Sequence, residues 1–267
     1  MLTMGIDIGS AACKSIVLKD GKSIVGKAVF PLGTGTLGSQ KVFEMALDDA
    51  HVRREDLSRI MVTGYGRFTF DPADSQRSEI TCHAAGVHFL NPQVRTVLDI
   101  GGQDIKVLRL NERGGVENFV MNDKCAAGTG RFLEVMARVM NVKTEELGAL
   151  SKQSTQEISI SNTCTVFAES EVISKLSSGA ALADIVSGIH TSVAKRVVAL
   201  ALRNGIEREV AISGGVALND GVVTALSREL KMPVLVHGLS QYAGALGAAI
   251  HAAKELLEVL AKQSKVK

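Results

Sequence analysis

Two cysteines and three glycine-bearing turns are the residues whose types and spacing could do chemistry in this chain. Cys125 lies in the polar, glycine-rich stretch 122–131, and Cys164 lies in the stretch 161–169; each precedes an expected helix. At a helix start the free backbone N–H groups and the positive end of the helix dipole favour a thiolate over a thiol. Because the thiolate is the form that binds metal, both positions are candidate metal ligands.

The number of such cysteines limits the kind of site. A four-iron cluster takes four thiolates, so one chain with two candidates supplies half of the set, and two chains around a two-fold axis supply all four. On spacing alone, two such cysteines are more often structural thiols than metal ligands, and that alternative stays open at this point. Cys13 and Cys82 are interpreted as structural. Because the chain has no Cys-x-x-Cys pair, a self-contained zinc site is not expected.

The three turns are Asp7-Ile8-Gly9-Ser10, the stretch 99–104 (Asp-Ile-Gly-Gly-Gln-Asp) and Ser213-Gly214-Gly215, each directly after a short apolar stretch. Glycine lets backbone N–H groups approach phosphate oxygens closely, and successive amides form an anion-binding nest. A neighbouring carboxylate can hold Mg²⁺ or orient an attacking water, and Lys14 could neutralise phosphate charge. One such turn alone is more typical of an ordinary hairpin, so the signal is the set of three.

The elements that would position these residues read as two similar halves. The stretch 97–106 matches 5–14 in its Asp-Ile-Gly core, its lysine and its apolar flanks, which indicates an internal duplication. Strands are predicted at 3–8, 14–19, 60–63, 210–212 and 233–236, with another ending at Phe30, and helices at 42–50, 167–176, 185–202 and from 242 onward.

Composition excludes several classes. The 267 residues carry a net charge of +2, with 46% hydrophobic and 22% charged residues, two Tyr and no Trp. A nucleic-acid surface would need clustered basic residues and stacking aromatics, so no nucleic-acid partner is expected. The first residues lack the apolar run of a signal peptide, and the apolar stretch 242–253 is too short to span a bilayer, so the protein is expected to be cytoplasmic, with no membrane partner.

In this order, the three turns resemble those of the actin, sugar-kinase and heat-shock chaperone ATPase superfamily. The resemblance implies an α/β fold of two duplicated actin/ribonuclease-H-like halves with ATP in the cleft between them. The first half would be 1–93, with a C-terminal helix at 242–267 packing back on it, and the second 94–241. Asp7 and Asp104 would be the catalytic residues, facing Mg²⁺ and phosphate. The implied cofactor-binding positions are Gly9, Ser10, Ala11, Ala12, Cys13, Lys14, Gly101, Gly102, Gln103, Thr129, Gly214, Gly215 and Gln241.

Five strings carry a closer resemblance over nearly the whole chain: 122–133, 163–174, Thr63-Gly64-Tyr65-Gly66-Arg67, 99–104 and 244–249. They resemble the activator component of 2-hydroxyacyl-CoA dehydratases, within the BadF/BadG/BcrA/BcrD ATPase family, which also includes ATPase subunits of benzoyl-CoA reductases. The resemblance implies a homodimer with one bridging [4Fe–4S] cluster, held by Cys125 and Cys164 of each chain.

The function implied by this resemblance is ATP hydrolysis coupled to one-electron transfer. A reduced ferredoxin or flavodoxin would supply the electron, and a 2-hydroxyacyl-CoA dehydratase would receive it. The alternatives are the corresponding subunit of an aryl-CoA reductase, which shares the mechanism, a small-molecule kinase on the same fold, which needs no iron, and a chaperone- or actin-type nucleotide switch, against which the lack of a long substrate-binding extension argues.

Overall fold

A computed structural model describes residues 1–161 and 163–264. The chain divides into two compact units. Unit 1 comprises Met1–Gln93, Leu110–Val116 and Leu239–Lys267, and unit 2 comprises Val94–Arg109 and Glu117–Gly238. The first unit thus ends its N-terminal stretch at residue 93, takes in 110–116 from within the expected second half, and resumes at 239, slightly before the expected C-terminal helix. Residues 265–267 of that helix lie outside the described part.

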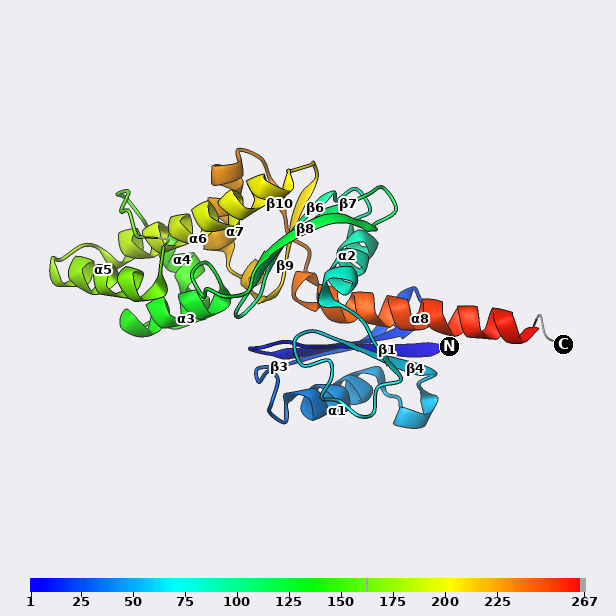
Figure 1. Ribbon diagram of the computed structural model, residues 1–267. Helices are drawn as coiled ribbons and strands as arrows, with labels where there is room; N and C mark the ends of the chain where they lie inside the picture. The colour runs from blue at the N-terminus through cyan, green and yellow to red at the C-terminus, as the bar shows by residue number, and fades with distance from the viewer. Residues whose placement is uncertain (162, 265–267) are drawn as a thin grey trace. The chain divides into compact units, whose positions relative to one another are not determined.

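Unit 1 is built on a five-stranded sheet of order β3-β2-β1-β4-β5, antiparallel from β3 to β1 and parallel from β1 to β5. Helix α1 lies on one face and α8 on the other, where α8 also packs along α2 (Figure 1). The elements are β1 Leu2–Ile8, β2 Cys13–Lys19, β3 Ser23–Phe30, α1 Gly38–Ala50, η1 Arg54–Asp56, β4 Arg59–Thr63, β5 Ser75–Gln76, α2 Glu79–Leu90, η4 Ser240–Tyr242 and α8 Ala243–Ser264.

Small residues allow the close approach of α8 in unit 1. A Cβ on Gly5 of β1 would collide with the backbone of Ala245 and Ala249, and a Cβ on Gly247 would collide with the backbone of Cys82 in α2. The run of glycine and alanine at the start of α8 therefore lies directly against the sheet and against α2. Side-chain bulk at these positions would push the helix off the strand that carries Asp7.

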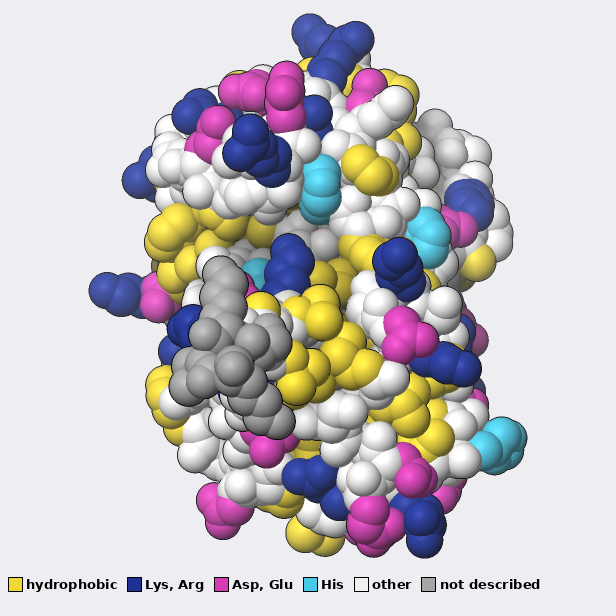
Figure 2. All heavy atoms as spheres, turned by 90° about the vertical axis from the view of Figure 1, so that its right-hand side faces the viewer, with side chains coloured by type: hydrophobic (Ala, Val, Ile, Leu, Met, Phe, Trp, Pro, Cys, Tyr) yellow, Lys and Arg dark blue, Asp and Glu magenta, His cyan; other side chains and the backbone are white. Residues whose placement is uncertain are grey.

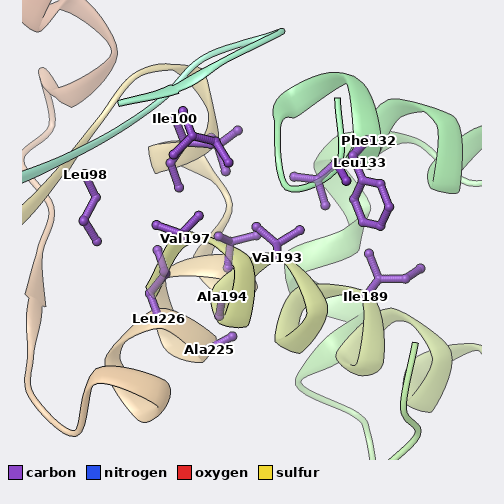
Figure 3. Packing of buried hydrophobic residues seen from close by; sticks show 14 of the residues in the cluster. Leu98, Ile100, Phe132, Leu133, Ile189, Val193, Ala194, Val197, Ala225 and Leu226 are labelled. Atoms are coloured by element: carbon purple, nitrogen blue, oxygen red, sulfur yellow. The ribbon is translucent and has the colours of Figure 1, made fainter. Parts of the chain in front are cut away.

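Unit 2 has a sheet of order β10-β9-β6-β7-β8 and a large helical layer. Its core is centred on one face of α6, where Ile189, Val193 and Val197 follow each other at helical spacing against side chains of α3, α7 and β6 (Figure 3). The elements are β6 Thr96–Ile100, β7 Ile105–Leu110, β8 Val116–Asn122, α3 Gly130–Val139, η2 Thr144–Glu146, α4 Leu147–Ser151, α5 Thr165–Ser177, α6 Leu182–Asn204, β9 Val210–Ser213, η3 Gly215–Leu218, α7 Asp220–Leu230 and β10 Val234–Leu235.

The two sheets repeat the same topology, which confirms the internal duplication. Strand β1 pairs antiparallel with β2 and parallel with β4, and β6 pairs in the same way with β7 and β9. The registers also match, because Asp7 faces Lys14 across the first hairpin and Asp99 faces Lys106 across the second. Corresponding residues of the two halves can therefore be compared one by one.

Helix α6 is long and apolar enough, by length and composition, to cross a membrane. However, 67% of its apolar window is buried inside the protein, and its apolar face carries the core of unit 2. It is therefore explained as a core helix. On the face drawn in Figure 2, basic and acidic side chains are interspersed, without the single-sign stripe that nucleic-acid binding uses.

Candidate functional site

Asp7 near the end of β1 and Lys14 near the start of β2 pair across the first hairpin, at the base of the loop between the two strands. Lys14 Nζ lies 3.5 Å from Asp7 Oδ2 and donates to the carbonyl oxygen of Ala12 at 3.4 Å. Both side chains are largely buried, with 11% and 7% of their surface exposed. A Cβ on Gly9 would stand 2.8 Å from the Ala12 carbonyl oxygen, so the loop needs glycine there. The first predicted loop is thus a tight turn with its carboxylate and ammonium groups at its base.

The loop between β6 and β7 repeats this arrangement with one addition. Lys106 Nζ lies 3.5 Å from Asp99 Oδ2, and it also pairs with Asp104 Oδ2 at 2.6 Å. A Cβ on Gly101 would stand 2.5 Å from Asp104 Oδ1, so the backbone of the loop approaches this carboxylate closely. Gln103 at the tip is exposed, and Gly102 is half-buried. Two carboxylates and one ammonium group therefore meet beneath the second predicted loop.

Asp99 is a residue that the sequence reasoning missed as a candidate. Its Oδ1 accepts a hydrogen bond from Ser213 Oγ at 2.9 Å, and it is the register counterpart of Asp7. The internal repeat, which aligns these two aspartates, is the signal that could have found it. Asp104 instead corresponds to Ala12 in the first half, since each lies two residues before the paired lysine.

A glycine with left-handed φ follows the parallel strand of each half. Gly64 after β4 has φ +88°, and Gly214 after β9 has φ +86°. A Cβ on Gly64 would collide with Asp7 Oδ1, and one on Gly214 would stand 3.0 Å from Asp99 Oδ1. Each glycine therefore lets the backbone close over its aspartate.

The third predicted turn combines one buried and one open glycine. Gly214 is buried, whereas Gly215 is exposed, and no described atom lies within 4 Å of a Cβ built on it. Open space beside a backbone amide is what a ligand approaching that amide needs. Gln241, the remaining predicted nucleotide residue, lies in η4 of unit 1 and is half-buried, whereas Gly214 and Gly215 belong to unit 2.

Cys125 precedes a helix, as expected, but it lies five residues before the first residue of that helix. Helix α3 begins at Gly130 with Thr129 as its N-cap residue, so the cysteine lies in the loop that leads to it. Thr129 is fully buried and donates from Oγ1 to the Ala126 carbonyl oxygen at 2.7 Å. The Cys125 carbonyl oxygen accepts from Asn122 Nδ2 at 3.3 Å. The loop is thus closed on itself by short-range hydrogen bonds, which delay the helix.

The start of α3 is hydrogen-bonded directly to the loop between β6 and β7, residues 101–104. The backbone N–H of Gly130 donates to the carbonyl oxygen of Gly101, and that of Arg131 donates to the carbonyl oxygen of Gly102, both at 2.9 Å. Two of the free N–H groups at this helix start are satisfied in this way. The loop 101–104 and the cysteine loop are therefore joined through the first turn of α3.

Cys164 is the N-cap residue of α5, as the sequence predicted for a cysteine at a helix start. Its carbonyl oxygen accepts the first helical bond, from the Ala168 N–H at 3.1 Å. Glu171 Oε2 accepts a hydrogen bond from the Ser161 N–H at 2.8 Å. This contact ties Ser161, three residues before Cys164, to the second turn of α5. Helices α3 and α5 pack against each other, so the two cysteine loops serve neighbouring helices.

The four cysteines fall into two classes by environment. Cys125 and Cys164 are half-buried, whereas Cys13 and Cys82 have no exposed surface. Burial raises the pKa of the Cys13 thiol to about 11 and that of the Cys82 thiol to about 12, which keeps both protonated. The donor chemistry thus leaves two accessible sulfurs per chain. Among the described residues, no group of three or more His, Cys, Asp or Glu side chains could hold a metal ion.

The sequence profile of the BadF/BadG/BcrA/BcrD ATPase family matches residues 4–252. The chain is 54% identical over 258 residues to the 2-hydroxyisocaproyl-CoA dehydratase activator of Clostridioides difficile, covering 97% of both chains. It is 53% identical to the (R)-2-hydroxyglutaryl-CoA dehydratase activating ATPase of Acidaminococcus fermentans, covering 95% of this chain and 97% of that one. A benzoyl-CoA reductase subunit of Thauera aromatica is 34% identical, over 93% and 92% of the two chains.

The solved structures give the same relationship. The activator of the 2-hydroxyisocaproyl-CoA dehydratase from Clostridium difficile, with bound ADPNP, matches with a TM-score of 0.95 at 53% identity, covering 100% of this chain and 98% of that one. The expected fold class is thereby confirmed.

Proposed function

Because the chain belongs to the BadF/BadG/BcrA/BcrD ATPase family, we propose that it is the ATP-hydrolysing activator of a 2-hydroxyacyl-CoA dehydratase. The observation that carries this proposal is the degree of identity: 53–54% to two named activators over at least 95% of the chain, against 34% to the benzoyl-CoA reductase subunit. The two activators act with dehydratases of different hydroxyacyl-CoA substrates, so the proposal extends to the class of partner and no further.

ATP is bound through the loops at the ends of the two hairpins. The backbone amides of 9–12 and of 101–103 contact phosphate oxygens, with Lys14 as the counter-charge in the first half. The carboxylates of Asp7 and Asp104 face the phosphates, where they hold Mg²⁺ and orient water; the ion supplies neutralisation of the charge that develops on the phosphoryl oxygens. Thr129, Gly214 and Gly215 complete the nucleotide contacts in unit 2, and Gln241 is a further contact from unit 1.

The accessible sulfurs of Cys125 and Cys164 fit half of a [4Fe–4S] site. Four thiolates are needed, so a homodimer in which each chain gives two is the arrangement that fits the donor set. Such a cluster would store a single electron. A reduced ferredoxin or flavodoxin would donate this electron, and the dehydratase would receive it. The buried thiols of Cys13 and Cys82 do not fit this role, because neither is accessible and burial raises both pKa values.

The coupling between the two activities runs through α3. Since the N–H groups of Gly130 and Arg131 are bonded to Gly101 and Gly102, a change of the loop when phosphate is bound or released is transmitted to the first turn of α3 and to the cysteine loop. Backbone N–H groups around cluster sulfurs tune the potential, and for one electron about 1.4 kcal/mol of differential stabilisation corresponds to about 59 mV. Such electron transfer would take place in the cytoplasm.

The ligand assignment is tested by protein purified without oxygen. We expect Cys125→Ala to lose iron and the iron-dependent absorbance, because it removes a sulfur from each chain. Cys82→Ala is the matched control: it also removes one thiol, but a buried one, and should retain the iron. Full iron content in Cys125→Ala would contradict the assignment.

The assignment to a dehydratase is tested by activation assays. The purified protein, with ATP and a chemical reductant, should activate a 2-hydroxyacyl-CoA dehydratase that has been prepared without its own activator. Under the same conditions it should not support reduction of benzoyl-CoA by a reductase lacking its ATPase subunits. Transfer of phosphate to a sugar acceptor in place of activation would instead favour a kinase.

A further inference from the structure

The two halves place the same residues at the same positions but connect them differently. Across the hairpins Asp7 faces Lys14 and Asp99 faces Lys106; across the parallel pairs Asp7 faces Thr63 and Asp99 faces Ser213. The ion pair between the matched lysine and aspartate is 3.5 Å long in both halves. Because these pairings are equivalent, contacts that differ between the two halves indicate different roles for the matched residues.

In unit 1 the matched side chains are only loosely connected to one another. Lys14 Nζ has the long contact to Asp7 and a 3.4 Å contact to a backbone carbonyl oxygen, because the residue two positions before it is Ala12. The Thr63 hydroxyl, the counterpart of Ser213 Oγ, is buried and makes no hydrogen bond to Asp7 among the described residues. The ammonium group of Lys14 consequently retains donor capacity for an anionic ligand.

In unit 2 the corresponding groups form a closed network. Ser213 Oγ donates to Asp99 Oδ1, and Asp99 Oδ2 faces Lys106. The ammonium group of Lys106 makes its short contact, 2.6 Å, with Asp104 Oδ2, and only 4% of the Lys106 side chain is exposed. This lysine is therefore committed to two carboxylates within its own unit and is shielded from a ligand.

The contact with Lys106 orients the carboxylate of Asp104. Its Oδ2 is held by Lys106, while Oδ1 takes part in no hydrogen bond or ion pair among the described residues. The side chain is 14% exposed, more than those of Asp99 and Lys106. A carboxylate fixed through one oxygen presents the other in a defined direction, which is what positioning of water or substrate requires.

We propose that Lys106 is a positioning residue for ATP hydrolysis, which bridges Asp99 and Asp104 and thereby holds Asp104 in place, whereas its counterpart Lys14 contacts the nucleotide phosphates. The inference rests on the proposed ATPase function and assigns different roles to the two equivalent lysines. Lys106 acts on the turnover of bound ATP through Asp104, and Lys14 acts on the binding of ATP.

The test compares Lys106→Met, its matched counterpart Lys14→Met, Asp104→Asn and the double variant Lys106→Met/Asp104→Asn in oxygen-free dimeric protein. For each, kcat and KM for ATP are measured, together with the Kd of a non-hydrolysable ATP analogue and the iron content. We expect Lys106→Met to lower kcat about 100-fold, the order of loss that follows a 1 Å misplacement, while the Kd changes by less than about threefold. Lys14→Met should weaken the analogue at least about tenfold.

The double variant decides whether Lys106 acts through Asp104. Its kcat should equal that of Asp104→Asn within about threefold, because the group that Lys106 positions is already absent. The double variant removes the Lys106 charge together with that of its partner Asp104, so it leaves fewer buried charges unpaired than Lys106→Met does. If Lys106→Met does not fold, the comparison of the double variant with Asp104→Asn is the test. A kcat for the double variant that falls by the product of the two single effects would overturn the proposal, as would a Lys106→Met variant whose Kd rises in proportion to its loss of kcat, or one with wild-type kcat.

The two proposals fail in different ways. Wild-type protein that neither binds nor hydrolyses ATP would refute the proposed function. Wild-type protein that hydrolyses ATP, combined with a Lys106→Met variant of unchanged kcat, would refute the positioning role alone.

Discussion

Replacing each glycine of the pair after β9 by alanine should separate folding from ligand binding. Gly214 has φ +86° and ψ 177°, a region that is essentially restricted to glycine and costs other residues about 1–3 kcal/mol. An alanine Cβ would also stand 2.8 Å from the carbonyl carbon of Ile100 and 3.0 Å from Asp99 Oδ1. Since overpacking costs about 1 kcal/mol or more in addition to the conformational cost, we expect Gly214→Ala to lower the free energy of unfolding by at least about 2 kcal/mol.

Gly215 should behave in the opposite way in the absence of nucleotide. No described atom lies within 4 Å of a Cβ built there, and its φ is outside the glycine-favouring range. Alanine at such a position stabilises by about 0.4–1 kcal/mol, chiefly by reducing the entropy of the unfolded chain. In the proposed site, however, the added methyl group occupies space needed by the nucleotide, at a cost of about 1–3 kcal/mol of binding, or roughly a 5- to 150-fold weaker ATP Kd.

Thermal unfolding with and without ATP measures both effects. For a protein of this size about 1 kcal/mol shifts Tm by roughly 2–4 °C, so Gly214→Ala should unfold at least about 4 °C below wild type. Gly215→Ala should match or slightly exceed the wild-type Tm without ATP and gain less from added ATP. A Gly215→Ala variant with wild-type ATP affinity would refute the assignment of this turn to the nucleotide; an unchanged Tm for Gly214→Ala would refute the strain argument.

Two other predictions follow from burial. After a chelator has removed any iron held at the proposed site, iodoacetamide should label Cys125 and Cys164 but leave Cys13 and Cys82 unlabelled until the protein unfolds. Peptide mass spectrometry identifies the labelled cysteines, and early labelling of a buried thiol would contradict this prediction. Burial lowers the pKa of His190 from 6.5 to about 4, so the unfolded chain takes up this proton at higher pH than the folded protein does. Stability should therefore fall between pH 6.5 and pH 4 by up to about 1.4 kcal/mol per pH unit from this residue, and His190→Gln should show a shallower pH dependence in denaturant titrations.

Local patterns in the sequence were sufficient to predict most strands and the duplication. The match between 97–106 and 5–14 reflects a real equivalence, because strand and hairpin residues are constrained by neighbours a few positions away. The strings around Cys125 and Cys164 were likewise enough to identify the family. These features depend on periodicity, turn chemistry and near neighbours in the chain.

Features that depend on distant contacts were not predictable. Helix α3 starts five residues after Cys125 because Thr129 and Ala126 close a turn and because Gly101 and Gly102 bond its first amides. Nothing near residue 171 in the sequence indicates that Glu171 binds the backbone of Ser161. In the same way, the network that joins Ser213 to Asp99 requires that β9 lie beside β6, a pairing of residues more than 100 positions apart.

The two bonds between the 101–102 backbone and the start of α3 use only main-chain atoms. They do not depend on the side chain at Arg131, which is exposed, whereas a Cβ at Gly130 would stand 3.3 Å from the Gly101 carbonyl oxygen and crowd this acceptor. A change in chain length would break these two hydrogen bonds, because one residue inserted between Cys125 and Gly130 would move the helix amides out of line with their acceptors. Insertions and deletions in this short segment should thus be the changes that uncouple nucleotide turnover from the proposed electron delivery.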